Sequence, residues 1–251
     1  MNQSPIPAIS FGDLARKLNG PCPPVTRNPG WAEWNTEVDD AIILRYLYKH
    51  HQPRRHLEFG TWQGFGACLC LEASAATVWT LNLPDGEAKD DGSWAYGERV
   101  IDDAKAPPGA ITANYGQDES GPRTYHRTDA ASYIGRLYRE KQLGHRVCQI
   151  YCDSRDWDTH GYPEGFFDSV FIDGGHQTEV VISDTRKALP LLRPGGFMLW
   201  HDFCPHPDII AGSPSVQGVT AAIETMRAEL TDQFATLEWI DPSFILLGIK
   251  R

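Results

Sequence analysis

The chain has 251 residues, 41% of them hydrophobic and 22% charged, which is typical of a globular protein with a substantial core. It carries 33 acidic and 23 basic residues, and the net charge of -10 disfavours partners with a phosphate backbone or an anionic membrane surface. The six cysteines include no Cys-x-x-Cys pair, no apolar run is long enough to span a membrane, and the first residues lack a signal-peptide pattern. We therefore expect a cytoplasmic protein with no nucleic-acid or membrane partner.

The N-terminal residues 1–36 are rich in Pro, Gly and Asn, which predicts an arm or lid that precedes a domain at 37–251. A second stretch rich in Gly, Pro and Asp, at about 85–127, predicts an irregular insertion in that domain. Apolar periodicity predicts the regular elements. In chain order they are helix 11–18, helix 36–49, strand 56–59, helix 67–76, strand 78–83, helix 130–142, strand 146–151, strand 167–172, helix 179–192, strand 197–200, helix 215–230, strand 236–240 and strand 244–249.

Strands and helices alternate along most of the chain, which predicts an α/β fold with a mostly parallel seven-stranded sheet and helices on both faces. Only Asp241, Pro242 and Ser243 separate the last two strands. Because this connection is too short for a crossover helix, we expect the last strand to run antiparallel.

Three glycines follow Glu58 between the first strand of the sheet and its helix, at Gly60, Gly64 and Gly66. Glycine permits positive φ angles and a close approach of the backbone to a ligand, and ligands of open α/β sheets bind at the carboxyl ends of strands. The spacing is not the G-x-G-x-x-G fingerprint, which disfavours a dinucleotide. The sequence thus predicts a ligand-binding turn, with tight helix packing as the alternative.

Titratable residues follow two fully apolar strands: Asp173 and His176 follow one, and His201 and Asp202 follow the next. Such residues are costly at the end of a buried strand unless they bind a ligand or pair with each other. Asp173, His201 and Asp202 are candidate ligands of Mg²⁺ or another hard divalent cation, and His176 is a candidate general base. The alternative is that these side chains cap helices through loop hydrogen bonds.

Polar residues also end two further strands. Asn82 ends the second strand, and Asp153 and Ser154 follow the third. An acid followed by a hydroxyl residue is also typical of a helix N-cap, so the pattern alone leaves ligand binding and capping open.

Three motifs in the chain resemble those of a known family. They are the Glu-x-Gly-x-x-x-Gly turn, the segment Phe-Asp-Ser-Val-Phe-Ile-Asp-Gly-Gly-His at 167–176, and the segment Leu-Arg-Pro-Gly-Gly-Phe-Met-Leu-Trp-His-Asp-Phe at 192–203. Over about 37–250 the chain resembles class I S-adenosylmethionine-dependent methyltransferases, in particular the small-molecule branch that contains macrolide-sugar O-methyltransferases. The resemblance implies a Rossmann-like fold and S-adenosylmethionine as cofactor. The cofactor-binding residues that it implies are Glu58, Gly60, Thr61, Gly64, Asn82, Asp153, Ser154 and Asp173.

The resemblance also assigns roles within this set. Asn82 falls where a ribose-binding carboxylate is usual, and Asp153 falls where an acid accepts a hydrogen bond from the adenine amine. Asp173 and Asp202 match metal-binding positions, His201 stands where an acid or amide is usual, and His176 matches the base of macrolide-sugar enzymes.

Together these features predict an enzyme that transfers a methyl group to a hydroxyl of a small molecule, with His176 and Asp173 as catalytic residues and a divalent cation assisting. Aromatic residues of the arm and the insertion are candidates for packing the acceptor, and these two segments leave room for a homodimer. The alternatives are a metal-dependent, oxygenase-like enzyme on the same fold and a non-catalytic cofactor-binding protein. The aromatic candidates are Trp31, Trp34, Trp94 and Tyr96.

Overall fold

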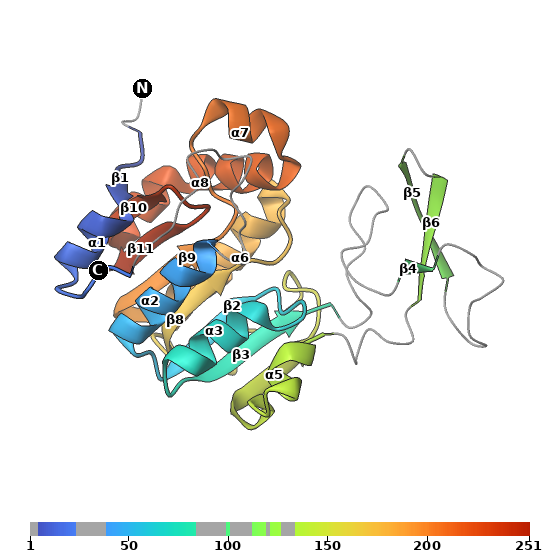
Figure 1. Ribbon diagram of the computed structural model, residues 1–251, viewed down its shortest axis with the longest axis horizontal. Helices are drawn as coiled ribbons and strands as arrows, with labels where there is room; N and C mark the ends of the chain where they lie inside the picture. Colours follow the sequence, from blue (N-terminus) through green and yellow to red (C-terminus); the bar gives the residue numbers. More distant parts are fainter. Residues whose placement is uncertain (1–4, 24–38, 84–98, 101–111, 119–120, 127–133) are drawn as a thin grey trace.

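The computed structural model describes residues 5–23, 39–83, 99–100, 112–118, 121–126 and 134–251. A central sheet runs through the main body of the molecule, with helices packed against it (Figure 1). Its eight strands lie side by side in the order β1 (Ala8–Ser10), β10 (Phe234–Asp241), β11 (Leu246–Lys250), β9 (Leu192–Trp200), β8 (Phe167–Ile172), β2 (Arg55–Phe59), β3 (Thr77–Asn82) and β7 (Val147–Tyr151).

The sheet is parallel except at β11, which runs antiparallel to β10 on one side and to β9 on the other. This confirms the predicted mostly parallel sheet with an antiparallel last strand, and all seven predicted strands are present. The eighth strand, β1, was not predicted: it comes from the N-terminal segment and pairs in parallel with the end of β10. A strand of three residues is too short to show a period-2 apolar pattern.

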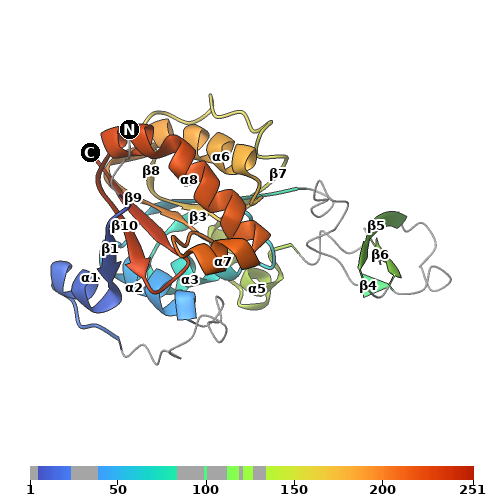
Figure 2. The same ribbon diagram turned by 90° about the horizontal axis from the view of Figure 1, so that it is seen from above.

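Helices cover both faces of the sheet, as predicted, and Figure 2 shows the two layers from above. Alternate residues of β8 supply the two cores: Val170 and Ile172 belong to the core under α6 and α8, and Phe171 belongs to the core under α1, α2 and α3. The helices are α1 (Phe11–Lys17), α2 (Ala41–His51), α3 (Phe65–Ala73), α5 (Arg136–Glu140), α6 (Thr178–Leu191), α7 (Pro207–Gly212) and α8 (Pro214–Gln233).

The predicted irregular insertion contains a small sheet. Strands β4 (Arg99–Val100), β5 (Thr112–Asp118) and β6 (Gly121–His126) form it in the order β4-β6-β5, with antiparallel pairing throughout. Both views place it apart from the main sheet (Figures 1 and 2). The expectation of an irregular segment is therefore wrong for these residues, because their strands are short and mostly polar and show no apolar alternation.

The boundaries of the predicted helices differ most around α5. The prediction placed a helix at 130–142, whereas α5 spans Arg136–Glu140 and is followed by a short 3₁₀ turn at Gly144–Arg146. Residues 127–133 lie outside the described part of the chain. In the part that the structure describes, no helix combines the length and the apolar character that crossing a membrane requires.

Candidate active site

The ends of β2, β8 and β9 meet at one edge of the sheet because their backbones pack closely. The Asp173 N–H donates to the carbonyl of Phe59, and the His201 N–H donates to the carbonyl of Ile172. Gly60 has a φ of 93°, and a Cβ atom there would lie 2.0 Å from the carbonyl oxygen of Asp173. Only glycine fits this position, which lies where the strand order reverses and where ligands of open α/β sheets bind.

The glycine turn is held by the neighbouring strand β3. The N–H groups of Gly60 and Thr61 both donate to the carbonyl of Leu81. Asn82 accepts a hydrogen bond from the Trp62 N–H at 3.0 Å through its Oδ1 atom. Gly64 caps α3 with a φ of 86°, a conformation that favours glycine. The predicted cofactor residues Thr61, Gly64 and Asn82 thus all shape the turn.

Glu58 lies beneath this turn and lines neither of the two cavities described below. Its side chain is 1% exposed, and one carboxyl oxygen accepts a hydrogen bond from the Thr80 hydroxyl at 2.6 Å. Burial raises the pKa of Glu58 to about 8, the charge of Asp173 adds to this, and hydrogen bonds from Thr80 and the Ala67 backbone oppose it. Its geometry is that of a buried support for the start of α3, although a cofactor contact was predicted.

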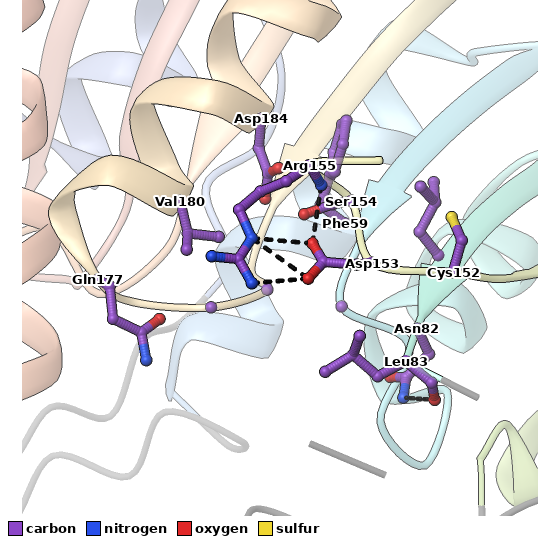
Figure 3. A pocket seen from close by; sticks show the side chains of 14 residues that line it. Phe59, Asn82, Leu83, Cys152, Asp153, Ser154, Arg155, Gln177, Val180 and Asp184 are labelled. Atoms are coloured by element: carbon purple, nitrogen blue, oxygen red, sulfur yellow. Dashed lines mark hydrogen bonds and ion pairs between the residues drawn. The ribbon is translucent and has the colours of Figure 1, made fainter. Parts of the chain in front are cut away.

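One cavity opens over the ends of β2, β3 and β7 and the start of α6 (Figure 3). We call it the first cavity. It brings together four of the predicted cofactor residues, Gly60, Asn82, Asp153 and Ser154. Its complete lining is Phe59, Gly60, Leu81, Asn82, Leu83, Cys152, Asp153, Ser154, Arg155, Gly174, Gly175, Gln177, Val180 and Asp184.

Asp153 already has a partner within the chain. The Arg155 guanidinium binds both of its carboxylate oxygens, at 2.7 Å and 3.1 Å, and the Arg155 N–H donates to the same side chain. The hydrogen bond from Arg155 is the main cause that lowers the pKa of Asp153 below its usual value. The turn geometry that the sequence left open as an alternative is therefore present, and the adenine contact of Asp153 stays a prediction.

A second cavity adjoins the first at Gly60, which lines both. It contains the four titratable residues that follow two apolar strands in the sequence, namely Asp173, His176, His201 and Asp202, which we call the rim residues. Its other lining residues are Leu44, Thr61, Trp62, Phe65, Gly66 and Phe171. The aromatic acceptor candidates Trp31, Trp34, Trp94 and Tyr96 lie outside the described residues.

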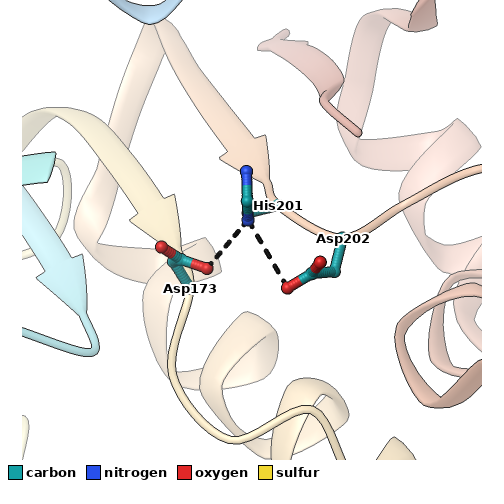
Figure 4. Close-up of side chains that lie close together, drawn as sticks. All are labelled: Asp173, His201 and Asp202. Carbon is teal, nitrogen blue, oxygen red and sulfur yellow. Dashed lines mark ion pairs between the residues drawn. The ribbon is translucent and has the colours of Figure 1, made fainter. Parts of the chain in front are cut away.

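The titratable residues of the second cavity form one connected cluster, of which Figure 4 shows Asp173, His201 and Asp202. The Nδ1 atom of His201 lies 3.1 Å from Asp173 Oδ1 and 3.4 Å from Asp202 Oδ2. The Nε2 atom of His176 lies 2.9 Å from the same Oδ2 atom of Asp202. Asp202 has a φ of 56°, a strained conformation for a residue other than glycine that typically persists at functional sites.

The charges in this cluster compensate each other. Burial disfavours a charged His201, but the carboxylates of Asp173 and Asp202 outweigh this and raise the pKa of His201 well above its ordinary value. Burial likewise disfavours a charged Asp202, whereas His201 and His176 hold its pKa far below its usual range. The two carboxylates thus favour the charged form of His201 against the effect of burial.

Sequence reasoning missed a third carboxylate in this cluster, that of Asp40. It is fully buried at the start of α2, its Oδ2 atom lies 3.1 Å from His201 Nε2, and its Oδ1 atom accepts a hydrogen bond from the Phe244 N–H. In the sequence it is the second of two adjacent acids before an apolar helix, a pattern that indicates an N-cap. The structure shows no side-chain cap there.

The residues at the rim fit a divalent cation. One ligand atom each from Asp173, His201 and Asp202 lies within 4.8 Å of the others. The set of two carboxylates and one imidazole suits a transition metal such as Mn²⁺ at least as well as Mg²⁺. Asp40 supplies the outer carboxylate that a metal-binding histidine usually has on its other nitrogen. A cation bound there would replace the contacts of His201 Nδ1 with the two carboxylates.

Comparisons with known proteins agree with this geometry. A family model described as a methyltransferase domain matches residues 57–203, more than half of the chain. Among solved structures, the chain is similar to the SAH-bound methyltransferase PaMTH1 of Podospora anserina, with 16% identity, a TM-score of 0.54, and coverage of 90% of this chain and 82% of that one. It is also similar to the O-methyltransferase from Bacillus cereus in complex with SAH, with 18% identity, a TM-score of 0.51, and coverage of 94% and 86%.

A third similar structure is that of cofactor-bound Rv0187 from MTB, with 17% identity, a TM-score of 0.52, and coverage of 99% of both chains. A search of curated proteins gives no sequence match. The solved structures share the fold of this chain, and the family model covers the strands that form both cavities. The chain therefore belongs to the methyltransferase domain family and is an enzyme of that class.

Proposed function

We propose that this enzyme is an S-adenosylmethionine-dependent O-methyltransferase that acts on a hydroxyl group of a small molecule. The observation that carries the proposal is the meeting of two cavities at Gly60, one lined by the predicted cofactor residues and the other by acid–base pairs. The similar structures of the Podospora anserina and Bacillus cereus enzymes, both bound to SAH, support the choice of cofactor.

In this proposal the first cavity holds the adenosine part of the cofactor, and Gly60 lies beside its sulfonium end. Thr61, Asn82, Ser154 and Asp173 complete the contacts, whereas Gly64 and Glu58 act through the shape of the turn. When bound, S-adenosylmethionine supplies an electrophilic methyl group, which the acceptor oxygen attacks as the bond from sulfur to methyl breaks. Holding the two reacting atoms aligned contributes about 7–11 kcal/mol toward lowering the barrier.

The second cavity supplies the proton chemistry. His176 takes the proton of the acceptor hydroxyl, and Asp202, 2.9 Å from its Nε2 atom, orients the ring and stabilises the charge that forms on it. Asp173, His201 and Asp202 would hold a divalent cation, which when bound polarises the hydroxyl as a Lewis acid. Without a cation, His201 itself holds Asp173 and Asp202 close together.

Two measurements test the proposal. Calorimetric titration with S-adenosylmethionine and SAH, with and without Mg²⁺ or Mn²⁺, tests for the cofactor site. Transfer of a labelled methyl group to a panel of small hydroxylated acceptors then tests the reaction. Transfer to an acceptor oxygen supports the proposal and excludes an oxygenase-like or non-catalytic protein. Absence of any cofactor binding would overturn it.

A further inference from the structure

The carboxyl group of Asp184 is buried in the wall of the first cavity without a partner. Asp184 lies on α6, its side chain has no exposed surface, and neither carboxyl oxygen has a hydrogen-bond partner in the described structure. A buried carboxyl group without a donor is costly, typically by more than the gain from an ordinary hydrogen bond. Such a group indicates that its partner is a molecule that binds in the cavity.

The cationic side chains near Asp184 are engaged elsewhere. The Lys187 ammonium donates to the carbonyl of Trp157 at 2.7 Å, and the Arg155 guanidinium binds Asp153. The Ser154 hydroxyl is close enough to lower the pKa of Asp184 in part, but it forms no hydrogen bond of ordinary geometry. Burial dominates and raises the pKa of Asp184 to about 7.

The direction from which a ligand would approach Asp184 follows from the cavity wall. In Figure 3 the Arg155 guanidinium lies between Val180 and Asp153, with Asp184 above it, and all four residues line the cavity. The Arg155 side chain is 55% exposed and binds both carboxylate oxygens of Asp153, so it stays at the rim of the cavity. Asp184 itself lines the cavity, and the apolar side chains of Leu83 and Val180 in the same lining suit the faces of a flat ring.

We propose that Asp184 accepts a hydrogen bond from the exocyclic amine of the cofactor's adenine ring and thereby makes the site selective for a 6-aminopurine. This inference rests on the proposed function, which assigns the adenosine part to the first cavity. Since the reacting sulfonium belongs at Gly60, where the cavities meet, the purine extends away from it into the first cavity. The Asp184 carboxylate can only accept hydrogen bonds, so it suits a 6-amino group, which donates one, and repels the oxygen of a 6-oxo group. Asp153 then acts at the rim, held by Arg155.

The test compares SAH with S-inosylhomocysteine, which carries a 6-oxo group in place of the 6-amino group. Calorimetry at pH 8.5, above the pKa of about 7 that burial gives Asp184, should show that the wild type binds SAH about 10- to 100-fold more tightly, the range for one hydrogen bond to a charged group. In Asp184→Asn the ratio should fall by about tenfold or more, because the carboxamide can donate to a 6-oxo group. Asp153 is the rival acceptor for the same amine, so Asp153→Asn should keep the wild-type ratio; loss of the preference in that variant and not in Asp184→Asn would assign the amine to Asp153 and refute the role of Asp184.

The outcomes separate this inference from the proposed function. If the wild type binds SAH but does not discriminate between the ligands, or if Asp184→Asn discriminates as the wild type does, the role of Asp184 is refuted and the proposed function stands. If the wild type binds neither ligand, both fall. The wild-type comparison needs no variant, and a thermal melt of Asp184→Asn shows whether that variant is folded. If it is not folded, Asp184→Ala replaces it, because alanine removes the carboxylate acceptor, and an unchanged ratio in that variant would count against the proposal.

Discussion

The Nε2 atom of His201 lies 3.1 Å from the Oδ2 atom of Asp40, a buried carboxylate that stands 161 residues earlier in the chain. The other ring nitrogen of His201 faces Asp173 and Asp202. Helix α2 therefore fixes the orientation of a histidine at the end of β9, and the arrangement of the whole rim depends on it. This relationship makes Asp40 a positioning residue for the second cavity.

Replacement of Asp40 by Asn should weaken the binding of a divalent cation. The outer partner of a metal-binding histidine typically contributes 10- to 100-fold to metal affinity, so we expect about that loss for Mn²⁺ in a calorimetric titration. SAH affinity should stay unchanged, because Asp40 lines neither cavity. The neighbouring acid offers a matched control in Asp39→Asn. Equal Mn²⁺ affinity in the wild type and Asp40→Asn would show that Asp40 does not act through a metal site.

Replacement of His176 by Asn should remove the general base and leave the cofactor site intact. Loss of a positioned base typically reduces the rate about 10²- to 10⁴-fold, and we expect a decrease in kcat of that size in the labelled-methyl assay. SAH affinity should change little, because His176 lines only the second cavity. His160→Asn serves as control, since His160 lines neither cavity and its side chain is 96% exposed. A normal kcat in His176→Asn would assign the proton to another group.

The sequence predicts the four rim residues because each follows a strand whose apolar run is easy to recognise. Asp173, His176, His201 and Asp202 lie in one cavity for this reason. Asp40 and Asp184 escape prediction because each is an acid at the start of or within a helix, where an acid is ordinarily a cap or part of a solvated face.

The limits of sequence reasoning about the fold have a similar cause. Strand β1 and the small sheet of β4, β5 and β6 consist of short or polar strands, whose pairing partners no local pattern specifies. The cofactor contact of Glu58 stays a prediction from its place in the glycine motif, and no local pattern specifies the burial of its side chain, which depends on packing against α3. The domain boundary at residue 36 and the homodimer stay predictions.

Replacement of Gly60 by Ala should destabilise the protein and weaken cofactor binding. The positive φ of 93° costs an alanine about 1–3 kcal/mol, and the Cβ atom would overlap the Asp173 carbonyl. Relief of this overlap would separate β2 from β8 where the cavities meet, so SAH affinity should fall together with Tm. Gly161→Ala is the matched control, because nothing lies within 4 Å of a Cβ atom there. Unchanged Tm and SAH affinity in Gly60→Ala would refute the role of this close approach.

Replacement of Glu58 by Gln should flatten the pH dependence of stability. The folded-state pKa of Glu58 is about 8, against an ordinary value of 4.5, so between these pH values the folded protein holds a proton that the unfolded chain releases. This contribution to stability is complete below pH 4.5, and it is lost as the pH rises toward 8, by up to about 1.4 kcal/mol per pH unit.

Glutamine mimics the protonated carboxyl group and cannot release a proton. We therefore expect Glu58→Gln to match the wild type near pH 5 and to exceed its free energy of unfolding near pH 8, as measured by urea denaturation at each pH. Part of the dependence of the unfolding free energy on pH should remain in Glu58→Gln, because burial also raises the pKa of Asp184 to about 7. The double variant Glu58→Gln with Asp184→Asn should remove most of that remaining dependence. If the slope between pH 5 and 8 is the same in the wild type and Glu58→Gln, the buried carboxyl of Glu58 is not protonated at neutral pH.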